Sequence, residues 1–95
     1  MSKEECPLCK TADAMCEWNG HGMNHFQCIG ACGAFEIHDS VKAVLDEEDY
    51  RDKLPLVKRA AARYSKEGRL LSIDSREAFF EIAAAQDGLE RSPKP

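Results

Sequence analysis

Apolar and polar residues alternate along the first third of the chain. The runs 15–18 and 25–28 fit short strands, and Asn19-Gly20 at the end of the first run is a strong hairpin signal. In the run 34–38 the apolar side chains recur with a period of two, which is typical of a strand with one buried face. Residues 5–38 are therefore expected to form a ribbon of short strands.

Beyond residue 38 the apolar period rises to about 3.6, which predicts helices. Asp39 and Ser40 are both good N-caps for a first helix. A second helix is predicted over residues 55–67, because Pro55 suits the first turn of a helix and Gly68 suits its C-terminal stop.

The remaining segments are shorter or less regular. Residues 46–52 are acidic and fit either a loop or the start of the second helix. Residues 70–73 are apolar and fit a strand or a buried link. Asp74 is the expected N-cap of a third helix that ends at Asp87-Gly88. Residues 91–95 contain two prolines and predict a disordered tail.

These elements predict an α+β fold with about three short α-helices. A chain of 95 residues allows one domain, or one small module with an appendage. The pattern places the ribbon in residues 1–38 and a helical region packed on it in residues 39–90.

All five cysteines lie between positions 6 and 32. The N-terminus is polar and acidic, so it does not resemble a signal peptide, and no stretch approaches the ~20 apolar residues of a membrane span. We therefore expect a cytoplasmic protein without a membrane partner. Thiols stay reduced in that compartment, so clustered cysteines indicate a metal site rather than disulfides.

The cysteine spacing is that of two metal-binding turns. Cys6 and Cys9 are separated by two residues, and Cys28 and Cys32 by three. Two thiolates at one tight turn can point the same way, and a second such turn completes a tetrahedron. Four thiolates leave no open position for water, which favours one structural Zn²⁺ ion. A ribbon of fewer than ~40 residues buries little apolar surface, so we expect the metal to hold it together.

The segments Cys6-Pro7-Leu8-Cys9, Phe26-Gln27-Cys28 and Cys32-Gly33-Ala34-Phe35-Glu36-Ile37 resemble the zinc-ribbon family. The resemblance covers residues 5–38 and implies a three-stranded ribbon around one zinc. The ligands that it implies are Cys6, Cys9, Cys28 and Cys32. The chain departs from the family in Lys10, where glycine is favoured, and in the three residues inside the second turn. Zinc ribbons occur in proteins of transcription, translation and replication and in many small prokaryotic or phage proteins. The resemblance therefore indicates a structural scaffold but not a particular function.

Other readings of this region stay open. His25 also has ligand spacing to Cys28 and is the alternative to Cys32. Iron instead of zinc, or reduced cysteines without metal, are further alternatives. The fifth cysteine, Cys16, fits a buried strand residue that behaves as a small hydrophobe.

Charge is segregated along a chain whose net charge of −4 disfavours general nucleic-acid binding. Acidic residues dominate positions 36–52 and basic residues dominate positions 51–69. Arg59, Arg63 and Lys66 share one face of the helix predicted over residues 55–67, which is either a partner-binding stripe or a solvated face. Phe80 lies off the apolar stripe of the third helix, and marks a partner or dimer surface or packs on the ribbon.

No recognisable nucleophile motif or phosphate-binding loop is present in the sequence, so enzymatic activity is not expected. We expect a zinc-stabilised, non-enzymatic interaction module that binds a protein or nucleoprotein partner. One alternative is a DNA-binding regulator that uses the basic helix 55–67. Another is a phage or mobile-element inhibitor that docks on a host enzyme.

Overall fold

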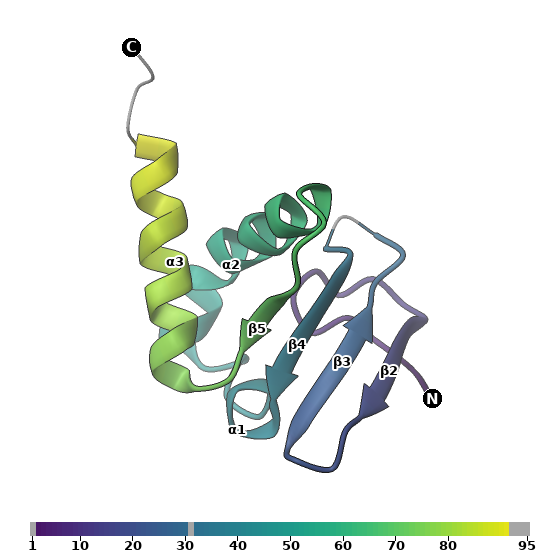
Figure 1. Ribbon diagram of the computed structural model, residues 1–95. Coiled ribbons are helices and arrows are strands. Elements are labelled where there is room, and N and C mark those ends of the chain that lie inside the picture. Colours follow the sequence, from purple (N-terminus) through teal and green to yellow (C-terminus); the bar gives the residue numbers. More distant parts are fainter. Residues whose placement is uncertain (1, 31, 92–95) are drawn as a thin grey trace.

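The computed structural model describes residues 2–30 and 32–91 as an α+β fold, as predicted (Figure 1). Its elements are β1 (Ser2–Glu4), β2 (Ala14–Trp18), β3 (Met23–Gln27), β4 (Ala34–His38), α1 (Asp39–Lys42), α2 (Glu48–Lys66), β5 (Leu71–Ile73) and α3 (Arg76–Arg91). Among the described residues, no helix combines the length and apolar character that a membrane-spanning helix needs.

The expected three-stranded ribbon is part of a larger sheet, so that prediction was wrong in extent. Five strands lie in the order β1-β2-β3-β4-β5, with antiparallel pairs from β1 to β4. The apolar stretch after α2 forms β5, which pairs in parallel with β4 and sets Leu71 opposite Phe35. Leu71 and Ile73 alternate with Ser72, so β5 buries two side chains on the same face as its neighbour. The sheet thus includes a strand from the region predicted to be helical, beyond the expected end of the ribbon at residue 38.

The helices cover one face of the sheet, and the other face is open (Figure 1). Phe26 and Phe35 point to the covered face, where their rings stack with centroids 5.4 Å apart. Helix α2 contributes Val57, Ala60 and Ala61 to the same core, and all three are fully buried. Strand residues of the opposite parity, such as Glu17, remain in contact with solvent.

Helix α2 begins at Glu48, seven residues before the predicted start at Pro55. The acidic run is helical, and Glu48 and Asp49 lie in the first turn, where carboxylates interact favourably with the helix dipole. Pro55 therefore lies inside the helix and not in its first turn. Its ring faces solvent, where water can satisfy the carbonyl that loses its helical hydrogen bond.

The caps of the other two helices also differ from those predicted. His38, not Asp39 or Ser40, is the N-cap of α1, because its Nδ1 accepts the backbone N–H of Ser40 at 3.1 Å. At α3 the Ser75 hydroxyl accepts the backbone N–H of Ala78 at 3.0 Å, the role predicted for Asp74.

Helix α3 continues through Gly88 to Arg91 instead of ending at Asp87-Gly88. Its last turn gains tertiary contact because Glu90 pairs with Arg59 of α2. Arg91 is therefore helical, and the rest of the predicted tail, residues 92–95, lies outside the described residues.

Aromatic side chains join α2 to α3. Buried Phe79 lies 5.2 Å from Tyr50 and Phe80 lies 4.8 Å from it, measured between ring centroids. Phe80 therefore packs on α2 rather than on the ribbon, and 37% of its surface stays exposed.

Candidate metal centre

The four sulfurs implied by the resemblance come together between two loops. Cys6 and Cys9 follow β1, and Cys28 and Cys32 lie between β3 and β4. Their Sγ atoms all lie within 4.8 Å of one another, and those of Cys9 and Cys28 are 3.4 Å apart. A tetrahedral Zn²⁺ with Zn–S bonds of about 2.3 Å separates its sulfurs by about 3.8 Å. The arrangement therefore fits one metal ion after small side-chain movements.

Backbone hydrogen bonds shape the first turn. The N–H of Cys6 donates to the carbonyl of Thr11, and the N–H of Lys10 donates to the carbonyl of Cys6, both at 2.8 Å. Lys10 has a φ of +65°, in the left-handed region that favours glycine. Lysine adopts this conformation at a local cost of roughly 1–2 kcal/mol, which glycine would not incur.

The second turn closely approaches helix α2. The N–H of Cys28 donates to the carbonyl of Gly33 at 2.9 Å, and the N–H of Gly30 donates to the Sγ of Cys28 at 3.3 Å. Gly33 has a φ of +66°, and a Cβ atom added there would lie only 2.6 Å from the Cβ of Ser65. Only glycine fits so close to α2. The metal-binding turn and the helical layer therefore meet at this contact.

The cysteines strongly perturb one another's protonation. A hydrogen bond from the Cys32 thiol, together with the backbone N–H groups of Cys9 and Leu8, lowers the pKa of Cys6. The same pair interaction raises the pKa of Cys32, and burial raises that of Cys28. Without a cation, several adjacent thiolates repel one another, so the cluster retains protons. A divalent ion would displace those protons and hold the ligands as thiolates.

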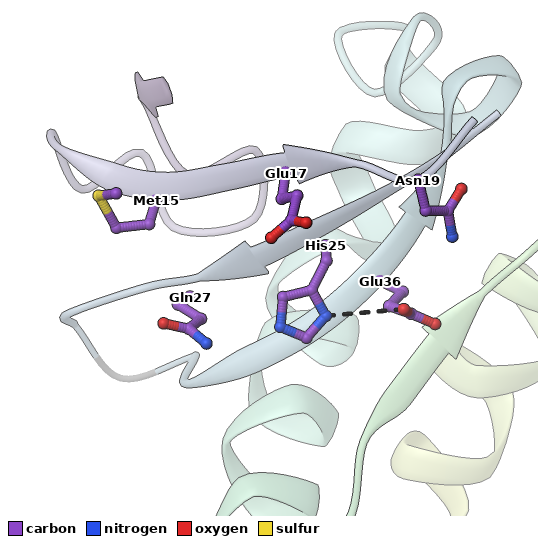
Figure 2. Close-up of a pocket in the computed structure, with 6 residues that line it drawn as sticks. All are labelled: Met15, Glu17, Asn19, His25, Gln27 and Glu36. Atoms are coloured by element: carbon purple, nitrogen blue, oxygen red, sulfur yellow. Dashed lines mark ion pairs between the residues drawn. The ribbon is translucent and has the colours of Figure 1, made fainter. Parts of the chain in front are cut away.

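His25 does not reach the sulfurs. It lies on the open face of β3, where its Nδ1 is 3.6 Å from the Oε2 of Glu36 (Figure 2). Its spacing to Cys28 suits a turn, but in an extended strand residues three apart point to opposite faces. The structure thus brings the four cysteines together, and His25 lies outside their cluster.

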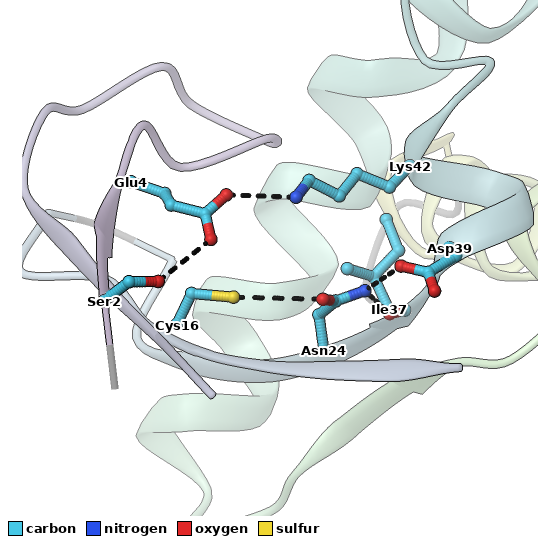
Figure 3. A network of polar contacts seen from close by, with 7 residues as sticks. All are labelled: Ser2, Glu4, Cys16, Asn24, Ile37, Asp39 and Lys42. Carbon is cyan, nitrogen blue, oxygen red and sulfur yellow. Dashed lines mark hydrogen bonds and ion pairs between the residues drawn. The ribbon is translucent and has the colours of Figure 1, made fainter. Parts of the chain in front are cut away.

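Cys16 lies on the covered face of the sheet, within a polar network (Figure 3). Its thiol donates to the Oδ1 of Asn24 at 3.9 Å. Burial, and then the nearby Glu4 carboxylate, raise the pKa of Cys16 to about 11. The fifth cysteine therefore stays protonated at neutral pH, which suits a small buried hydrophobe rather than a redox thiol.

The same network contains residues that the sequence did not single out. Buried Asn24 donates from Nδ2 to the Oδ1 of Asp39 at 2.7 Å and to the carbonyl of Ile37 at 3.2 Å. Nζ of Lys42 donates to Oε1 of Glu4 at 3.1 Å, which ties β1 to α1 (Figure 3). Asn24 lies just before the strand predicted over residues 25–28, whereas the structure places it inside β3, so the sequence pattern did not indicate its inward position.

The predicted basic stripe is largely engaged within the chain. Arg59 donates from Nε and Nη2 to both carboxylate oxygens of Glu90, at 2.6 and 2.8 Å. Arg63 donates from Nε to the Oε1 of Gln86 at 3.1 Å. Lys66 is exposed and makes no ion pair within residues 2–30 and 32–91. Two members of the stripe therefore hold α3 against α2.

Comparison of this chain with protein-family models, with curated proteins and with solved structures finds no match. The zinc-ribbon resemblance therefore depends on the quoted residues alone. The fold and the site define a small α+β protein with a four-cysteine candidate metal centre.

Proposed function

We propose that the protein is a zinc-stabilised, non-enzymatic interaction module that binds a protein or nucleoprotein partner. The observation that carries the proposal is the convergence of four cysteine sulfurs within 4.8 Å. A set of four thiolates is typical of structural zinc, because it fills the tetrahedral shell and leaves no position for substrate or water.

The surroundings of the site support a platform role for the metal. Ile29 lies inside the second metal-binding turn with 77% of its surface exposed. Coordination of Cys28 and Cys32 would fix this loop, and the contact of Gly33 with Ser65 would fix it relative to α2. A rigid loop loses less conformational entropy when it binds a partner than a mobile loop does.

The DNA-binding alternative has weaker support. A helix that binds phosphates needs free guanidinium groups, whereas Arg59 and Arg63 donate to side chains of α3. An inhibitor that docks on a host enzyme would use the same kind of platform, so the identity of the captured partner distinguishes it from other modules.

The test is affinity capture with matched cysteine variants, followed by mass spectrometry. The zinc-loaded protein and Cys16→Ser should capture the same stoichiometric partner, because Cys16 lies outside the sulfur cluster. Cys28→Ser should lose the partner together with the metal. Equal capture by Cys28→Ser and the wild type would contradict a metal-dependent platform. A salt-dependent mobility shift that requires Arg59, Arg63 and Lys66 would favour the DNA-binding alternative.

A further inference from the structure

A row of ionisable side chains crosses the open face of the sheet. Strand register sets Glu17 of β2 directly opposite His25 of β3, and His25 directly opposite Glu36 of β4. Side chains in such positions are close neighbours on one face. Figure 2 shows the imidazole between the strands that carry the two carboxylates.

This row lies in a depression of about 340 Å³ on the open face. The residues that line it are Met15, Glu17, Asn19, His25, Gln27 and Glu36. Met15 and Gln27 lie at one end and Asn19 at the other, with the ionisable row between them (Figure 2). The depression thus combines carboxylates with amide oxygens and one apolar wall.

The carboxylates lack strong cationic partners inside the protein. Within residues 2–30 and 32–91, Glu36 has only His25 within ion-pair distance, at 3.6 Å, and Glu17 has no cation that close. The two carboxylates therefore flank His25 on the open face of the sheet. This surface is electrostatically complementary to a cation.

The arrangement of the row indicates the kind of cation. In the part of the chain that the structure describes, only the four cysteines form a group of three or more potential ligands that could hold a metal ion. The Glu17–His25–Glu36 row is therefore not arranged to hold a metal ion. A guanidinium group presents five N–H donors on a rigid plane and can donate to carboxylates on both sides of it.

We propose that this depression binds an arginine side chain from a basic segment of a partner protein. The inference depends on the proposed interaction function and gives it a partner class and a surface. The guanidinium lies over the His25 imidazole, with Glu17 on one side and Glu36 on the other, and its aliphatic stem packs along Met15. The amide oxygens of Asn19 and Gln27 accept the N–H groups that the carboxylates leave free.

A peptide titration tests the site in the intact zinc-loaded protein. Hexa-arginine is added at low ionic strength, and backbone amide shifts are followed by NMR. The largest shifts should fall in residues 15–19, 23–27 and 34–38. Glu17→Gln/Glu36→Gln should weaken binding about tenfold or more. The control Glu77→Gln/Glu81→Gln, on the exposed side of α3, changes net charge equally and should weaken binding less than about twofold.

Substitution of His25 sharpens the test. His25→Lys places a permanent positive charge between the carboxylates and should abolish the shifts, whereas His25→Gln should keep them. Hexa-lysine should bind more weakly than hexa-arginine, because an ammonium group lacks the planar fork.

Three results would overturn the proposal. The first is that Glu17→Gln/Glu36→Gln and Glu77→Gln/Glu81→Gln weaken peptide binding equally, and the second is that the largest amide shifts fall in the acidic residues 46–52. The third is that hexa-lysine and hexa-arginine bind equally well. A partner captured in a zinc-dependent way but unaffected by Glu17→Gln/Glu36→Gln would keep the proposed function and remove this site.

Discussion

The two loops that carry the cysteines and the pair of helices α2 and α3 are stabilised in different ways. Within the described residues 5–13, 28–30 and 32–33, these loops contain no helix or strand, and a few backbone hydrogen bonds and the sulfur cluster hold them together. The helices bury apolar side chains such as Val57 and Phe79 and are linked by side-chain hydrogen bonds. The two regions meet where Gly33 contacts Ser65. Loss of metal should therefore act first on the loops, and loss of packing first on the helices.

Removal of one metal ligand should have the largest effect. Cys6→Ser deletes a fully buried sulfur of the cluster, so it should abolish most of the ~10–16 kcal/mol that structural zinc supplies at neutral pH. Zinc content and circular dichroism measure the loss. Cys16→Ser is the matched control, and equal destabilisation by the two variants would contradict the distinction between them.

Truncation of the aromatic side chain between the helices comes next. Phe79→Ala leaves a cavity beside Tyr50 and should lower the free energy of unfolding by about 3–5 kcal/mol. Denaturant titration measures this change. Before it unfolds, the variant should still bind one zinc per chain, because its four ligands come from other segments. Loss of zinc from the folded variant would mean that the two regions do not respond separately.

Gly33→Ala tests the contact between the regions. The added Cβ meets the Cβ of Ser65 and occupies a left-handed conformation, so we expect a loss of roughly 2–3 kcal/mol. Ser65→Gly in the same chain removes the steric part and should recover some of that loss. Thermal unfolding measures both variants, and full stability of Gly33→Ala alone would contradict the close approach.

The smallest effect is expected at the ion pair between the helices. The Arg59 guanidinium lowers the pKa of Glu90 to about 2, so the pair stabilises the folded state above the ordinary glutamate pKa of ~4.3. The stabilisation that the ion pair provides is lost as the pH falls from ~4.3 toward the folded-state pKa of about 2. The stability difference between wild type and Glu90→Gln should be small at pH 7 and should shrink in acid. A difference that grows on acidification would contradict the pairing.

The cysteine turns and the strands β2, β3 and β4 could be predicted because their signals are local. The cysteine spacing predicted the two metal-binding turns, with His25 as an alternative to Cys32, and the period of two predicted that Phe35 and Ile37 share one face of a strand. The start of α2 was missed because Pro55 is typical of a first turn, while the acidic run before it contains few apolar residues to show the helical period.

Other features depend on contacts between distant residues. Pairing of β5 with β4 joins residue 71 to residue 35, and three residues are too few to predict a partner strand. Arg59 lies 31 positions from Glu90, so its engagement could not be read from the helix face. The choice between His25 and Cys32 was also decided by the alternation of faces in β3.

The most direct test of the account is hydrogen exchange of the purified, reduced protein before and after chelation. One zinc per chain should be present at the start. Its removal should expose the amides of residues 5–13, 28–30 and 32–33 first, and those of the adjoining strands should follow. Protein that carries no metal after chelation, yet keeps the same protection in these residues, would contradict the account.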